Sequence, residues 1–107
     1  METDIIVVYC TVPKMEDARR IAQTIVNEKV AACCNIIPGV ESYYIWKDEV
    51  QQDKELLLMI KTTENAFREL QNRIIELHPY DVPEIIALPV IKGNNDYLTW
   101  VEKNVHY

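Results

Sequence analysis

The sequence has 107 residues, of which 49% are hydrophobic and 26% charged, and its formal net charge is −6. This composition is typical of a folded chain and excludes intrinsic disorder, and the length suits a single domain spanning residues 1–107. The acidic balance argues against a nucleic-acid partner, because binding to the phosphate backbone needs a surplus of Lys and Arg.

The amino-terminal residues and the cysteines indicate the cellular compartment of the protein. Glu2 and Asp4 precede the first apolar run without the basic region of a secretory signal, and the apolar runs are too short to cross a membrane. Cys10, Cys33 and Cys34 make an odd set without Cys-x-x-Cys spacing, which indicates free thiols. We therefore expect a cytoplasmic protein with no membrane partner.

A strand and a helix are predicted first along the chain. Residues 5–11 are apolar on both faces and too few for a helix, which is typical of a central strand. After Pro13, apolar residues recur at helical spacing from Ala18 to Val30. This pattern predicts an amphipathic helix of about four turns.

A long β-hairpin is predicted next. Residues 32–37 and 42–46 have strand character, and Pro38-Gly39 between them favours one bulged or bent strand over two separate strands. The polar residues 47–49 interrupt the pattern before a second apolar run at residues 56–60. The two runs are expected to pair across this break.

A second helix, an edge strand and a short last helix complete the prediction. Thr63 is an expected N-cap, and the helix is expected to end near His78 because Pro79 disfavours helical geometry before it. Residues 84–91 suit an edge strand because they contain Pro89. Asn94 or Asn95 can cap the last helix, which carries Tyr97, Trp100 and Val101 on one expected face.

The order strand, helix, strand, strand, helix, strand is the split pattern of the ferredoxin-like α+β fold. Right-handed crossovers then give the sheet order fourth, first, third, second strand, with antiparallel neighbours and both main helices on one face. The strands are apolar on both faces, so the face without helices needs a cover. Self-association is the simplest way to supply one.

This topology brings Cys10 and His78 to one rim of the sheet and predicts Cys33 and Cys34 at the opposite rim. A thiolate and an imidazole suit copper or zinc, with Asp81 or Glu84 as possible further ligands. The alternative is structural: a strand cysteine often packs as a small hydrophobe, and a histidine in a last helical turn interacts with the helix dipole.

Four other candidate roles stay open or are disfavoured. Tyr44 and Trp46 could stack on a planar ligand or supply interface area, and Lys61 could meet an anion or be a solvated charge. A nucleophilic Cys10 has no local signature for an orienting third group. An acylphosphatase-type hydrolase needs an Arg in a Gly-rich loop, whereas residues 11–14 contain neither, so no enzyme is expected.

Seven segments between Val7 and Trp100 carry a resemblance to a known family. They are Cys10-Thr11-Val12-Pro13, Val30-Ala31-Ala32-Cys33 with Asn35, Pro38-Gly39, Ser42 with Tyr44 and Trp46, Glu55 leading to Ile60-Lys61-Thr62-Thr63, His78-Pro79-Tyr80-Asp81-Val82-Pro83-Glu84, and Tyr97-Leu98-Thr99-Trp100. In this order the segments resemble the CutA, or divalent-cation tolerance, family.

The resemblance implies a ferredoxin-like subunit that assembles into a homotrimer similar to the PII signalling proteins. It also implies a role in tolerance to divalent cations, copper in particular, with proposed copper ligands that match Cys10 and His78. No metal is expected to be needed for folding. A second possibility is a PII-like regulatory or scaffolding trimer that binds a small molecule or partner in intersubunit clefts, lined by Tyr44, Trp46, Lys61 and Tyr80.

Overall fold

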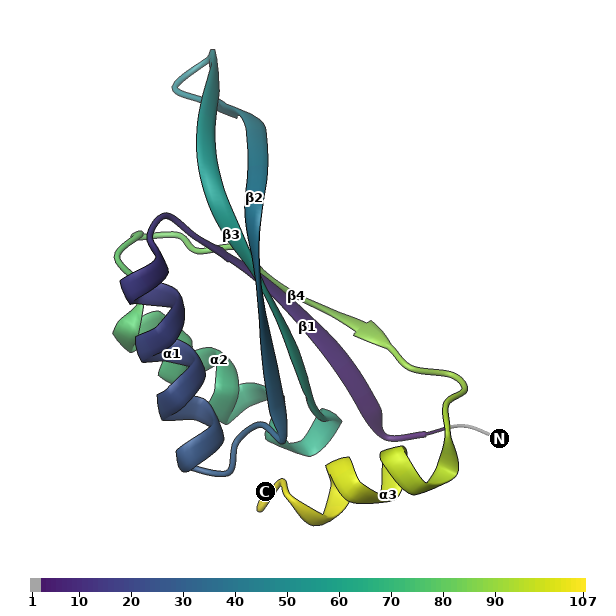
Figure 1. The fold of residues 1–107 in the computed structure, drawn as a ribbon. Coiled ribbons are helices and arrows are strands. Elements are labelled where there is room, and N and C mark those ends of the chain that lie inside the picture. Colours follow the sequence, from purple (N-terminus) through teal and green to yellow (C-terminus); the bar gives the residue numbers. More distant parts are fainter. Residues whose placement is uncertain (1–2) are drawn as a thin grey trace.

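A four-stranded antiparallel sheet forms the centre of the protein in a computed structural model that describes residues 3–107 (Figure 1). In chain order the elements are β1 (Ile5–Val12), α1 (Met15–Asn27), β2 (Cys33–Trp46), β3 (Glu49–Thr63), the 3₁₀ turn η1 (Glu64–Ala66), α2 (Phe67–Leu77), β4 (Ile85–Pro89) and α3 (Asn95–Lys103). This is an α+β arrangement.

The strand order in the sheet is β2-β3-β1-β4, with every neighbouring pair antiparallel. This is the order expected from right-handed crossovers. β4 lies at an edge, where the missing N–H of Pro89 is tolerated. The strand is shorter than expected and pairs with β1 from Ile6 to Cys10.

α1 ends earlier than its apolar periodicity suggests. Lys29 takes a left-handed conformation (φ 64°), and the chain then turns so that Val30 N–H donates to the Ile25 carbonyl. Val30 remains 2% exposed although it lies outside the helix. The residue is apolar because it packs in the core after the turn, not because it continues the helix face.

The start of α2 corrects one prediction, and its end confirms another. Thr63 precedes the 3₁₀ turn, but its side chain makes no capping bond, and Thr63 Oγ1 has no hydrogen-bond partner among residues 3–107. At the other end His78 is extended (φ −78°, ψ 138°), as the following Pro79 requires.

The last helix is capped by Asn94, whose side chain accepts hydrogen bonds from the N–H groups of Asp96 and Tyr97. The face predicted to carry Tyr97, Trp100 and Val101 together holds for the two aromatic residues but not for Val101. Leu98 and Val101 are buried, whereas Tyr97 and Trp100 are exposed and pack against each other with ring centroids 5.6 Å apart. Leu98 and Val101 pack in a cluster with Ile5, Ala66 and Val105.

The β2–β3 hairpin projects well beyond the other two strands (Figure 1). Its register shifts between Ile37 and Val40, which confirms the predicted bulge, and Gly39 takes a φ of 83° there. At the tip Lys47 and Asp48 both have positive φ values, the geometry of a two-residue turn that matches strand twist.

The two faces of the sheet differ in their cover. α1 and α2 lie on one side of the sheet (Figure 1). Alternate residues of β1 and β3, such as Val8 and Leu58, are fully buried on this side. The residues between them are only partly buried, and on β4 Ile86 is 51% exposed. We call this second side the open face.

Candidate functional site

His78 connects the end of α2 to the end of β1. Its Nε2 lies 2.8 Å from the carbonyl oxygen of Thr11, and its Nδ1 accepts the N–H of Tyr80 at 3.0 Å. Because a carbonyl can only accept, Nε2 carries the proton and both ring nitrogens are engaged. The ring also packs against Tyr80, with centroids 4.9 Å apart. His78 therefore fixes the start of the loop before β4.

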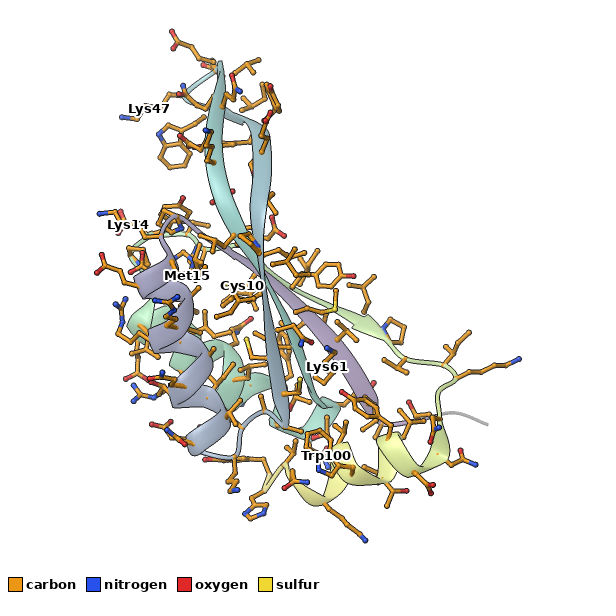
Figure 2. All side chains as sticks on the ribbon, in the orientation of Figure 1. Cys10, Lys14, Met15, Lys47, Lys61 and Trp100 are labelled. Carbon is orange, nitrogen blue, oxygen red and sulfur yellow. The ribbon has the colours of Figure 1, made fainter. Side chains whose placement is uncertain are left out.

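Cys10 lies on the helix-covered side of β1 and is completely buried (Figure 2). Burial, and then the negative charge of Glu84, raises the pKa of its thiol to about 12. Its thiol donates a long hydrogen bond of 3.8 Å to the Thr11 carbonyl. As it stands, Cys10 is a protonated, inward-facing thiol.

The structure brings Cys10, His78 and Glu84 to one rim. His78 contacts Thr11, the residue after Cys10, and Glu84 precedes Ile85, the cross-strand partner of Cys10. Asp81 lies in the same loop, and both Asp81 and Glu84 are exposed. Within residues 3–107, however, no group of three or more His, Cys, Asp or Glu side chains could hold a metal ion. One chain does not present a complete metal site in this conformation.

The other two cysteines point in opposite directions. Cys34 packs toward the helices, and burial raises the pKa of its thiol to about 12, whereas Cys33 faces the open side. The register places Cys34 level with Ile60 and therefore with Val8, only two positions from Cys10. The sequence had predicted a larger separation because it did not show where β2 begins relative to β1.

A cleft of about 790 Å³ opens between the hairpin and the loop before β4. Its lining residues come from β1, both hairpin strands and the loop: Thr11, Glu41, Ser42, Tyr43, Tyr44, Trp46, Glu55, Pro79, Tyr80, Asp81, Val82 and Glu84. Two predicted site residues, Asp81 and Glu84, thus share the cleft with three predicted ligand-contacting aromatics, Tyr44, Trp46 and Tyr80. We call it the rim cleft.

Glu55 also lines the rim cleft, although the sequence pointed to it only through the family resemblance and assigned it no role in a site. It is only 7% exposed, and its Oε2 accepts the hydroxyl of Tyr80 at 2.9 Å. Burial, and then this hydrogen bond, raises the pKa of Tyr80. The available signal was the position of Glu55 beside the apolar run of β3, where a carboxylate is unexpected.

Lys61 lies apart from the rim cleft. Its Nζ donates to Asn35 Oδ1. In Figure 2 Lys61 appears toward the α3 end of the sheet, and Cys10 lies between it and Lys47 at the hairpin tip. Lys61 was predicted to line the same cleft as Tyr44, but within a single chain the two belong to different regions.

Among residues 3–107, no helix has the length and apolar character needed to span a bilayer.

Known proteins match this chain both in sequence and in structure. The family model for the CutA1 divalent ion tolerance protein matches residues 6–104. The divalent-cation tolerance protein CutA of Thermus thermophilus is 54% identical over 98 residues, which cover 92% of this chain and 95% of that protein. The solved structure from this organism superimposes with a TM-score of 0.94 at 52% identity and covers 95% of this chain and 99% of that one.

A plant relative is similar but longer. Protein CutA, chloroplastic, of Arabidopsis thaliana is 48% identical over 92% of this chain, which spans only 54% of that protein's length. The names of these relatives refer to cation tolerance or to CutA and specify no reaction. With a family model over nearly the whole sequence and relatives at about half identity, the chain belongs to the CutA1 divalent ion tolerance protein family.

Proposed function

We propose that this protein acts in divalent-cation tolerance by binding metal ions, copper among them, as a homotrimer. The observation that carries the proposal is the rim at which Cys10, His78 and Glu84 meet. These groups combine soft and hard donors that suit copper or zinc. The cytoplasmic location stays a prediction.

Ligation at this rim requires local changes. Nδ1 of His78 becomes available when it releases the Tyr80 N–H, and the Cys10 thiol must lose its proton to become a ligand. Asp81 and Glu84 are already exposed. Because one chain offers too few converging ligands, the proposal assigns the remaining positions to water or to a neighbouring subunit.

The open face supports the assembly part of the proposal. Val7, Tyr9, Leu57 and Met59 alternate with the core residues of β1 and β3 and are only partly buried. Neighbouring Leu88 on β4 is 43% exposed. A contiguous apolar surface of this kind on a sheet is typical of an interface between subunits.

A titration with copper or zinc under anaerobic conditions tests the metal site. We expect the Cys10→Ser, His78→Ala variant to bind at least about tenfold more weakly than wild type, and the Asp81→Asn, Glu84→Gln variant to show a smaller loss. The matched control is Cys33→Ser, His106→Ala, which changes the same residue types elsewhere. Equal affinity for wild type and the Cys10, His78 variant would exclude this site.

A second candidate function is a PII-like regulatory or scaffolding trimer, and the rim cleft favours it. Tyr44, Trp46 and Tyr80, three of the four residues expected to line an intersubunit cleft, line this one. The fourth, Lys61, lies outside it. A thermal-shift screen with metabolites and metals separates the two candidates, since any molecule that binds the native state stabilises it. A metabolite that raises the melting temperature equally in wild type and in the Cys10→Ser, His78→Ala variant supports the second candidate.

A further inference from the structure

The carboxyl end of α2 is held by a side chain from α1. The Nη2 atom of Arg20 donates to the carbonyl oxygen of Leu77 at 2.9 Å and to Oδ1 of Asp17 at 3.0 Å. A terminal guanidinium nitrogen carries two N–H groups, so it can serve both acceptors at once. Because His78 follows Leu77, this contact fixes the backbone directly before the proposed ligand. We call Asp17, Arg20 and the Leu77 carbonyl the α2 clamp.

Helix electrostatics explain why a cation lies at this point. The last carbonyl groups of a helix lack partners within the helix and carry partial negative charge. The last turn of α2, residues 74–77, contains no basic residue of its own. α1 and α2 pack side by side on one side of the sheet (Figure 1), and Arg20 supplies the positive charge from the neighbouring helix. The clamp therefore opposes fraying of the end of α2.

Asp17 holds the Arg20 guanidinium in place. The Arg20 side chain is 46% exposed, so without a fixed partner it would be free to turn into water. Asp17 is only 7% exposed and lies three residues earlier on α1, the spacing at which side chains of one helix face meet. A hydrogen bond between two ionised groups is stronger than one between neutral groups. The buried carboxylate thus directs a flexible surface arginine toward α2.

The clamp lies next to the bonds that hold the His78 ring. The N–H of His78 donates to the Ile74 carbonyl at 2.8 Å, and its ring joins Thr11 and Tyr80. For Nδ1 to bind a metal ion, the ring must release the Tyr80 N–H while His78 stays beside Cys10. A fixed helix end lets the ring and the following loop move without the backbone leaving the rim.

We propose that Arg20, held by Asp17, is a positioning residue that keeps His78 at the rim for metal binding. Arg20 acts through the Leu77 carbonyl and does not contact the ion. Residues that orient a ligand from behind it change metal affinity markedly when they are replaced. This inference rests on the metal-binding function proposed above, because it assigns Arg20 a role in that same site.

Hydrogen exchange in the metal-free, full-length protein tests the clamp by itself. We expect Arg20→Gln to speed exchange of the His78 and Tyr80 N–H groups about fivefold, because the helix end loses a charged hydrogen-bond donor. Arg20→Lys should restore part of the protection, since lysine keeps a charged donor. Amides elsewhere in the sheet should exchange as in wild type.

Two control variants separate the clamp from general effects. Arg19→Gln removes the same charge from the exposed neighbouring position on α1. Arg73→Gln breaks a different polar link between the helices, the ion pair of Arg73 with Glu28 just after α1. Neither control should change exchange at His78 or Tyr80. Equal exchange in Arg20→Gln and the controls, or equally faster exchange of all slow amides in Arg20→Gln, would overturn the proposal.

A zinc titration of the same variants connects the clamp to metal binding. We expect Arg20→Gln to bind zinc about fivefold more weakly than wild type, Arg20→Lys to lose less, and both controls to match wild type. Unchanged affinity in Arg20→Gln, with wild type binding at Cys10 and His78, would contradict the positioning role. If wild type binds no zinc at this rim, the proposed function and the metal role of Arg20 fail together, while the exchange result still decides whether the clamp holds His78.

Discussion

His78 and Cys10 are neighbours at one rim, but their side chains are held in different ways. His78 uses both ring nitrogens to join Thr11 and Tyr80, so it positions the loop that carries Asp81 and Glu84. Cys10 faces the helices and packs as a buried thiol. The packing role expected for Cys10 is thus realised, whereas the His78 side chain bonds to Thr11 and Tyr80 and not to the carboxyl end of α2. A metal ion at this rim would have to compete with these contacts.

The buried thiols give a pH dependence that belongs to single residues. Burial raises the pKa of Cys10 and of Cys34 from 9.0 to about 12, so the folded protein keeps protons that the unfolded chain releases. The stability that these protonated thiols contribute is therefore fully present below pH 9 and falls as the pH rises toward 12, by up to about 1.4 kcal/mol per pH unit for each thiol.

Urea unfolding of wild type and variants across this pH window measures the effect. Cys10→Ala should lose stability less steeply with pH than wild type, while the half-buried Cys33, replaced in Cys33→Ala, serves as the control. Parallel curves for wild type and Cys10→Ala would show that the Cys10 thiol does not remain protonated in the folded state.

At the scale of elements, single Pro and Gly residues predicted where helices end and strands bend better than hydrophobic periodicity predicted helix length. Pro79 ended α2 at His78, and Pro38-Gly39 produced the bulge in β2, because each residue restricts or frees the backbone directly. The extent of α1 was less predictable: Val30 is apolar for tertiary reasons. The buried face of α3 depended on packing against residues far away in the chain, such as Ile5 and Ala66, which no local pattern contains.

The cap of α3 gives an element-scale prediction with a built-in control. The sequence left Asn94 and Asn95 as alternatives, and the structure assigns the capping bonds to Asn94. Asn94→Ala should lower the free energy of unfolding by about 1 kcal/mol, whereas Asn95→Ala, at the first helical position, should change it little. Urea denaturation of both variants provides the comparison, and a larger cost at Asn95 would reverse the assignment.

At the scale of the whole molecule, the strand order and the uncovered face followed from the order of elements and the handedness of crossovers. The rim cleft could not be predicted in this way. It depends on the strand register that sets Glu55 opposite Val40 and on the loop that brings Tyr80 to Glu55. These contacts join residues far apart in sequence. The aromatic residues of the cleft were predictable by type, but their acidic partner was not.

The projecting hairpin and the open face make the isolated chain an incomplete unit. Tyr43, Ile45 and Val50 on the hairpin are each more than 60% exposed, and the open face adds Ile86 and Leu88. Such surface is costly to leave in water, at roughly 25 cal/mol per Å². Both proposed functions include an assembly in which other copies of the chain would cover these surfaces.

Sedimentation equilibrium of the full-length protein, without metal and over a wide concentration range, tests this dependence most directly. The account predicts one species with three times the 12.5 kDa mass of the chain, stable on dilution. A mass of 12.5 kDa at all concentrations would contradict it, because the apolar open face would then stand uncovered in water.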